Sequence, residues 1–279
     1  MNTKWLWLGL LTLICATPAF AAHTNMHQLD IKTCRMSGQS IHDMWQHQLF
    51  DAPANVSAMM VAAMDGQTGK VQTTLATLPR KTMRRWRHLA LSMALLGGQS
   101  ATARALLSDG ADPNDEVLVP RLKSRFYNQM VGTMTQDPRF GGAKGVHAMK
   151  KSGLLSNGEN RGPVPLVTAI QCNNVAETRL LLQHGADPLR YARPHNPPRR
   201  QGPDPFMVAV MDGNPAILRL LMSHGAQPCP DDRRLAFDWN LQTDHRRKQP
   251  ATVAGIARHA GVSGTLLARL VCHRPSSSH

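Results

Sequence analysis

The chain repeats one pattern three times. Residues 89–114 read LALSMALLGGQSATARALLSDGADPN, residues 164–189 read VPLVTAIQCNNVAETRLLLQHGADPL, and residues 204–229 read DPFMVAVMDGNPAILRLLMSHGAQPC. The three lines align without a gap, and they share an alanine in column six, an arginine in column sixteen and a Gly-Ala pair near the end. A sequence that repeats at this length is expected to fold as stacked units rather than as one irregular domain.

Each unit predicts two short helices joined by a tight turn. The alanine in column six lies mid-way along the first helix, where a small side chain allows two helices to approach closely. The second helix carries apolar residues and ends at a glycine, which adopts a left-handed conformation without a side-chain clash. In two units Pro165 and Pro205 stand at the start of the first helix, where the missing N–H costs nothing, and Asp204 is placed to cap that helix.

These columns resemble those of the ankyrin repeat, over roughly residues 57–271. The resemblance implies an all-α fold, an ankyrin-repeat solenoid of about five stacked helix-turn-helix units with long loop insertions. It also implies the general role of that family, which is a non-enzymatic binding scaffold that uses loop tips and the concave face of its inner helices. Residues 57–76 and 252–271 keep the first glycine but lose the Gly-Ala tail, as terminal units often do.

The unit spacing defines the predicted domains. We expect a signal peptide over 1–21, an N-terminal capping segment over 22–56, a repeat domain over 57–275 with units near 57–82, 89–114, 164–189, 204–229 and 252–273, and a tail over 276–279. The longest gap between units, 115–163, is interpreted as an insertion. A degenerate repeat is the alternative, because residues 146–155 read as a second helix. The apolar spacing near 119–134 predicts a helix within the insertion.

The N-terminus predicts export. Lys4 precedes an apolar run over 5–16, and Ala19-Phe20-Ala21 fits a cleavage site of small residues. The apolar run is too short to span a membrane, and no later segment approaches ~18 uninterrupted apolar residues. Cleavage near Ala21 would leave a periplasmic or secreted chain.

Four cysteines remain after the predicted cleavage: Cys34, Cys172, Cys229 and Cys272. An oxidising compartment permits disulfides, and four cysteines allow three pairings. Stacking of the last two units makes Cys229 and Cys272 a disulfide candidate, with two separate buried thiols as the alternative. No partner is assigned to the other two from the sequence.

Basic residues dominate the charge, and the formal net charge is +14. The candidate partner-binding residues in the later loops are Arg190, Arg193, Arg199, Arg200, Arg233, Arg234, Arg246, Arg247 and Lys248. Further clusters are Lys144, Lys150 and Lys151 in the insertion and Arg80, Lys81, Arg84, Arg85 and Arg87 between the first two units. Because a solenoid places successive loops on one edge, we expect a basic ridge that favours acidic partners. Simple solubility is the alternative interpretation.

The expected partner is a protein, with weak binding to an anionic surface as a second possibility. Export argues against nucleic acid, and only Phe126, Tyr127 and Tyr191 lie near the basic clusters, too few for a platform on which bases stack. The chain contains none of the GxSxG, HExxH, P-loop or GxGxxG motifs. We therefore predict no enzymatic activity, no cofactor and no metal.

A metal site near the N-terminus is only weakly indicated. His23 and His27 stand four residues apart, and His42 and His47 follow, but two ligands without a third make a poor site. The preferred functional hypothesis is an exported protein-binding module, with an inhibitor or immunity protein for a periplasmic toxin or hydrolase as its concrete form. The alternative is a structural or stress-protection factor in the envelope that binds an anionic surface or a redox enzyme.

Overall fold

The computed structural model describes Cys34 and residues 38–151, 157–190, 204–226 and 253–270. Within these residues the fold is built from pairs of antiparallel helices. The pairs are α3 (Ala54–Met64) with α4 (Thr68–Thr77), α5 (Arg80–Leu96) with α6 (Ser100–Ser108), α9 (Pro165–Gln171) with α10 (Val175–Gln183), α11 (Pro205–Asp212) with α12 (Pro215–Ser223), and α14 (Val253–His259) with α15 (Gly264–Arg269).

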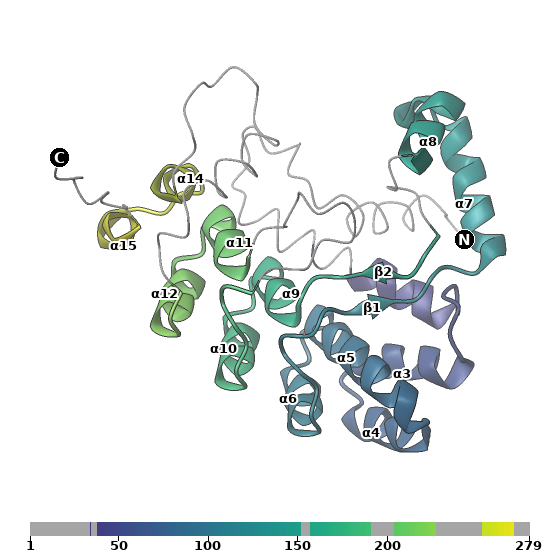
Figure 1. The fold of residues 1–279 in the computed structure, drawn as a ribbon, viewed down its shortest axis with the longest axis horizontal. Helices are drawn as coiled ribbons and strands as arrows, with labels where there is room; N and C mark the ends of the chain where they lie inside the picture. Colours follow the sequence, from purple (N-terminus) through teal and green to yellow (C-terminus); the bar gives the residue numbers. More distant parts are fainter. Residues whose placement is uncertain (1–33, 35–37, 152–156, 191–203, 227–252, 271–279) are drawn as a thin grey trace, which may run out of the picture.

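The pairs stack into a solenoid. The first helices pack in the order α3, α5, α9, α11 and α14, and the second helices α4, α6, α10 and α12 pack in a parallel row. In Figure 1 these appear as two rows, with α9 and α11 above α10 and α12. One continuous apolar cluster runs through the stack, from Ile41 to Leu270. The predicted all-α solenoid of ankyrin type is confirmed.

The repeated columns have the structural roles that their chemistry indicates. The alanines of the first helices are almost fully buried: Ala62, Ala94, Ala169, Ala209 and Ala257. The predicted cap is present, since the Asp204 carboxylate accepts a hydrogen bond from the N–H of Met207 at 2.7 Å. Asn174 and Asn214 cap α10 and α12 in the same way.

A left-handed residue joins the two helices of each unit. Gly66, Gly98, Gly213 and Gly261 have φ between 69° and 88°, and Asn173 occupies the same column with φ 53°. The turn requires a conformation that glycine adopts freely and that asparagine tolerates better than most residues. The third unit therefore keeps the turn without keeping the glycine.

An N-terminal helix over residues 38–46 covers the first unit. Trp45 and Phe50 are buried, and their ring centroids lie 4.2 Å apart. Cys34, which is itself helical, forms a disulfide with Cys172, the residue that follows α9. Neither cysteine was assigned a partner from the sequence, because their pairing joins parts of the chain that are far apart in the sequence. The candidate pair Cys229 and Cys272 lies outside the described residues.

The insertion forms a small helical hairpin of its own. It contains α7 (Ser124–Gln136), the short 3-10 helix η1 (Pro138–Phe140) and α8 (Gly142–Lys151). A two-residue antiparallel ribbon supports it, in which β1 (Leu118–Val119) pairs with β2 (Asn160–Arg161) in the register Leu118↔Arg161. The hairpin stands apart from the stack in Figure 1 and has its own apolar cluster, formed by Met130, Val131, Met134 and Val146.

Helix α5 is longer than the repeat predicts. It begins at Arg80, nine residues before the predicted unit start, because Pro79 opens it and Trp86 is buried in its extended part. Arg80, Lys81, Arg84, Arg85 and Arg87 therefore lie on a helix, and their assignment to a loop between units was wrong. No helix in the described residues is long and apolar enough to cross a lipid bilayer.

Candidate partner-binding surfaces

The later-loop residues of the predicted basic ridge lie almost wholly outside the described residues. Arg190 is described; it is half-buried, and its N–H donates to the carbonyl of Asp187 at 3.3 Å. The residues that lie outside are Arg193, Arg199, Arg200, Arg233, Arg234, Arg246, Arg247 and Lys248. The ridge over the later loops thus stays a prediction, whereas its clusters at 80–87 and 144–151 lie on helices α5 and α8.

The loops that follow α6 and α10 are joined by one side chain. The amide of Asn114 donates to the carbonyl of Gly185 at 2.8 Å, and its oxygen accepts from the N–H of Asp187 at 2.7 Å. These loops leave consecutive units of the stack, although the whole hairpin insertion separates them in the sequence. Asn114 therefore keeps the projecting loops aligned across the insertion.

A buried histidine attaches the first of these loops to helix α5. His88 Nδ1 lies 2.9 Å from Asp115 Oδ2, and His88 Nε2 accepts from the N–H of Asp112 at 3.1 Å. Arg84 also pairs with Asp115 at 2.9 Å. Burial lowers the pKa of His88, and the Asp115 carboxylate opposes that effect. A neutral ring that donates from Nδ1 and accepts at Nε2 satisfies both contacts.

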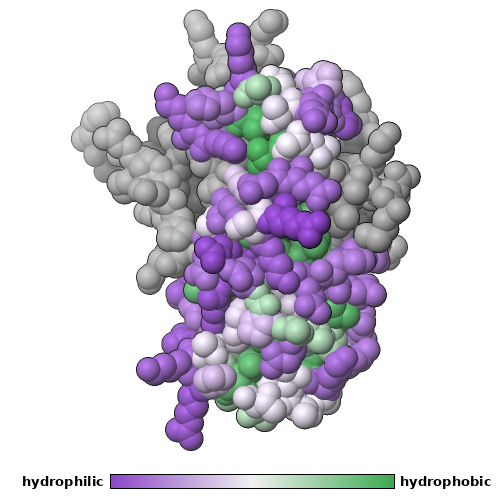
Figure 2. All heavy atoms as spheres, turned by 90° about the vertical axis from the view of Figure 1, so that its right-hand side faces the viewer, coloured by the Kyte–Doolittle hydropathy of each residue, from purple (hydrophilic) through white to green (hydrophobic). Residues whose placement is uncertain are grey.

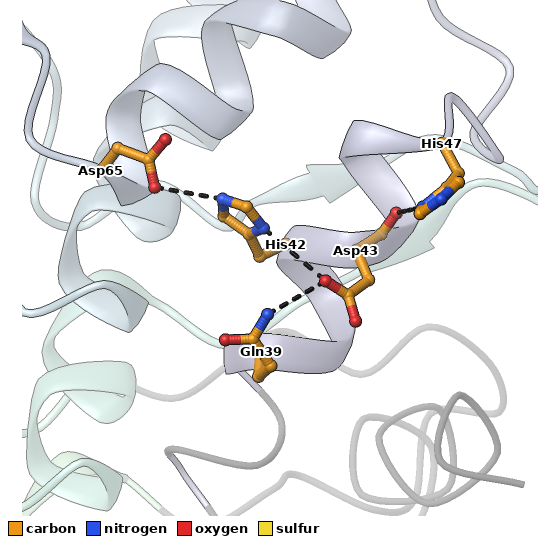
Figure 3. Close-up of polar contacts among 5 residues, drawn as sticks. All are labelled: Gln39, His42, Asp43, His47 and Asp65. Carbon is orange, nitrogen blue, oxygen red and sulfur yellow. Dashed lines mark hydrogen bonds and ion pairs between the residues drawn. The ribbon is translucent and has the colours of Figure 1, made fainter. Parts of the chain in front are cut away.

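A second histidine cluster lies on the N-terminal helix (Figure 3). His42 Nε2 lies 3.0 Å from Asp65, the residue that ends α3, and His42 Nδ1 lies 3.8 Å from Asp43. Gln39 donates to Asp43 at 3.0 Å, and His47 contacts the Asp43 carbonyl at 2.8 Å. No hydroxyl or thiol takes part in these contacts of the described residues. The cluster holds the N-terminal helix against the end of α3.

Metal binding finds no support in the described residues. Within them, no group of three or more His, Cys, Asp or Glu side chains is placed to hold an ion. His42 and His47 make the hydrogen bonds described above, while His23 and His27 lie outside the described residues.

A buried carboxyl group lies in the seam between α6 and α10. Glu177 is fully buried, and it occupies the helix column that holds Thr102 in α6 and Ile217 in α12. Its Oε1 accepts a long hydrogen bond from Ser100 at 3.4 Å, while within the described residues its Oε2 has no hydrogen-bond partner. Burial raises the pKa of Glu177 to about 7. Comparison of the repeat columns could have revealed this residue from the sequence.

The second helices carry one row of exposed cations. Arg104, Arg179 and Arg219 are all exposed, at the same column of α6, α10 and α12. Because α6, α10 and α12 pack in that order, an exposed arginine recurs once in each of these three units. This recurrence belongs to the repeat architecture and is set by its period.

The α7–α8 hairpin is the most basic described part of the insertion. Residues 121–151 contain seven lysines and arginines against one carboxylate, Asp137. Asp137 is bound by Arg139 at 2.6 Å, and Arg121 pairs with Asp51 at 2.7 Å. Five further cations are exposed: Lys123, Arg125, Lys144, Lys150 and Lys151. Figure 2 views the molecule from the side of the hairpin and shows a largely hydrophilic surface with narrow hydrophobic strips.

The fold assignment rests on the packing of the helices, because comparisons with known proteins add little to it. No family model and no curated protein match this chain. Among solved structures, the chain is similar to the crystal structure of the human ASB11 ankyrin repeat domain, at 19% identity over 76% of this chain and 96% of that chain, with a TM-score of 0.25. At that score the likeness carries no weight of its own. The stacked helix pairs and their repeated columns define a helical solenoid of the ankyrin type.

Proposed function

We propose that this chain is an exported, non-enzymatic module that binds an acidic protein, and that its concrete role is to inhibit or neutralise a toxin or hydrolase in the periplasm. The observation that carries this proposal is the contrast between polar groups that hold the fold together and basic side chains that are exposed. The clusters around His42, His88 and Asn114 hold helices and loops in place, whereas a large excess of exposed basic side chains is left for a partner.

Charge supports an acidic partner. The chain has 32 lysines and arginines against 18 acidic residues. A surface with such an excess attracts and orients negatively charged partners and raises the association rate at low salt. The N-terminal sequence supports export, because it combines a lysine, a short apolar run and small residues at the expected cleavage position.

A pull-down from periplasmic extract tests this function. The bait is the mature chain, and the test variant carries Arg199→Glu, Arg200→Glu, Arg246→Glu and Arg247→Glu. The matched control reverses four exposed helical arginines by the same total charge: Arg104, Arg179, Arg219 and Arg258. We expect the test variant to lose a specific acidic protein that the wild type and the control retain at equal salt.

Two results would contradict the proposal. Equal recovery of the partner by both variants would remove the basic loops from the interface. Recovery of membrane material instead of a protein would favour the alternative role, an envelope factor that binds an anionic surface. A captured hydrolase whose activity falls on titration with this chain would support the inhibitor form directly.

A further inference from the structure

The α7–α8 hairpin is a separate module rather than a loose loop. Its helices pack mainly against each other around Met130, Val131, Met134 and Val146. Both of its ends return to one place, because the Leu122 N–H donates to the Asn157 side chain at 3.0 Å and the Asn157 amide donates back to the Leu122 carbonyl at 3.0 Å. The module therefore has a fixed base.

That base is attached to the N-terminal capping region. The Lys123 N–H donates to the Leu49 carbonyl at 2.8 Å, and the Asp51 N–H donates to the Arg121 carbonyl at 2.8 Å. Arg121 also pairs with the Asp51 carboxylate at 2.7 Å. With three contacts to one short segment, the hairpin is held in a defined orientation, which lowers the entropy that a binding surface loses when a partner docks.

Both helices of the hairpin carry exposed cations. Lys150 and Lys151 end α8, and Lys123 and Arg125 flank the start of α7. Helices α7 and α8 pack against each other in one apolar cluster that includes Tyr127 and Met149, so these four residues belong to one module. Lys144 lies about two helical turns before Lys151 and therefore on the same side of α8. We call these five residues the basic hairpin surface.

The basic hairpin surface lacks carboxylates of its own. Neither α7 nor α8 contains an aspartate or glutamate, and within the described residues none of the five cations takes part in an ion pair. Opposite charges are normally interspersed on a surface whose only role is solubility. Here one sign is concentrated on a rigid projection.

The exposed side of α8 favours a protein over a lipid bilayer. Membrane-binding helices insert large apolar side chains into the interface. In α8 the large apolar residues Val146 and Met149 belong to the hairpin's own cluster with α7, and the exposed apolar residues are only Ala143 and Ala148. The surface can thus attract carboxylates, but it has little to insert among lipid chains.

We propose that the basic hairpin surface is a docking site for an acidic segment of a partner protein, rich in aspartate or glutamate. This inference rests on the proposed protein-binding function and names a surface for it that is distinct from the later loops. The lysines and arginines bind carboxylates of the segment, and the fixed hairpin base sets its position relative to the repeat stack.

The test is a titration with a defined probe, a fluorescent glutamate-rich peptide, followed by anisotropy at fixed salt. The test variant of the full mature chain carries Lys144→Glu, Lys150→Glu and Lys151→Glu. The matched control carries Arg104→Glu, Arg179→Glu and Arg219→Glu, which changes the net charge equally on the outer helices. We expect the hairpin variant to bind the peptide about tenfold or more weakly, and the control to change by less than about threefold.

Three outcomes would overturn the proposal. Equal weakening in both variants would mean that the peptide senses only net charge. Unchanged binding in the hairpin variant would place the acidic segment elsewhere. Tighter binding of the wild type to vesicles with 30% phosphatidylglycerol than to the peptide, lost in the hairpin variant, would make this a membrane surface. Circular dichroism of each variant verifies that the helices persist.

The two proposals fail separately. If periplasmic extract yields no partner for the wild type, the proposed function fails whatever the peptide titration shows. If the wild type captures a partner that the hairpin variant captures equally well, protein binding stands and the assignment of this surface fails.

Discussion

Asn114 binds both the carbonyl of Gly185 and the N–H of Asp187, so one side chain spans the loops of two consecutive units. Without it, the longest insertion in the chain would separate two loops that the solenoid has to keep in register. The contact fixes the position of one loop relative to the other, because both partners of Asn114 are backbone groups whose positions are set by their own unit.

Replacement of Asn114 by alanine should therefore weaken the stack. We expect Asn114→Ala to lower the free energy of unfolding by about 1–2 kcal/mol, since two hydrogen bonds are lost at a partly exposed site. Urea unfolding measures the change. Asn128→Ala, at an exposed position on α7, is the control and should change stability by less than about 0.5 kcal/mol. Equal effects of the two substitutions would show that the loop contact contributes little.

The disulfide between Cys34 and Cys172 closes a loop with a sequence separation of 138 residues. A crosslink over so long a loop restricts the unfolded chain strongly, and loop-closure entropy gives about 4–5 kcal/mol. The double variant Cys34→Ser, Cys172→Ser should lose about 3–5 kcal/mol of unfolding free energy under oxidising conditions. The oxidised wild type and the double variant are compared by denaturant unfolding.

Reduction provides the internal control for this disulfide. Reduced wild type should match the reduced double variant, because the bond is then absent from both. A further loss when the double variant itself is reduced would reveal a second disulfide, for which Cys229 and Cys272 are the remaining candidates. If the oxidised double variant is as stable as the oxidised wild type, the Cys34–Cys172 bond does not contribute to stability.

The repeat columns predicted the stacked helix pairs well, but they did not predict the features that depart from the repeat. Helix pairs, the Asp204 cap and the glycine turns follow from local chemistry that is written into each unit. The start of α5 was missed because its first nine residues lie outside the repeated pattern. The pairing of Cys34 with Cys172 joins parts of the chain that are far apart in the sequence, which no local pattern encodes.

The candidate sites were harder still to predict than the fold. Charge alone pointed to loops that lie outside the described residues, while the hairpin's separate apolar cluster appears only in three dimensions. Glu177 is a different case. On a helix a glutamate is ordinarily an exposed residue, yet the same column holds the fully buried Ile217 and Thr102, and that comparison was available in the sequence.

The buried Glu177 predicts that stability falls as pH rises. Its pKa in the folded chain is about 7, against an ordinary value of 4.5, so the folded state binds more protons between these values. Its contribution is fully present below about pH 4.5 and is lost as pH rises through about 7, by about 3 kcal/mol. Unfolding of the wild type and Glu177→Gln is measured from pH 4.5 to 8.

The Glu177→Gln variant should lose this pH dependence and be the more stable protein at pH 8. Glu177→Ile introduces the residue that α12 has in the same column, Ile217, and this variant should also be more stable than the wild type at neutral pH. Parallel pH profiles for the wild type and both variants would show that Glu177 does not titrate in this window.

His88 predicts the opposite slope. Its pKa is lowered from 6.5 by burial, so the unfolded chain binds the extra proton first as pH falls. The contribution of His88 is fully present above about pH 6.5 and declines as pH falls below that value. In His88→Gln this decline should disappear, and stability at pH 8 should drop by about 1–3 kcal/mol because the contacts to Asp112 and Asp115 are lost. An unchanged acid slope, measured by the same unfolding experiment, would argue against the buried neutral ring.

Gly213 combines a left-handed backbone with a close neighbour. Its φ is 71°, and a β-carbon placed on it would lie 2.2 Å from the carbonyl oxygen of Ala260 in the next unit. Gly225 has φ 93°, but a β-carbon there would meet no atom within 4 Å.

Gly225→Ala should therefore lower the free energy of unfolding only by the left-handed strain, about 1–2 kcal/mol. Gly213→Ala adds a backbone clash that the stacked units cannot relieve locally, and it should cost more than about 3 kcal/mol. The comparison of the two variants by urea unfolding isolates the packing between units, because both share the backbone strain. If the two losses are equal, the turn of the fourth unit does not press against the fifth, and the last helix pair is coupled to the stack only through its apolar side chains.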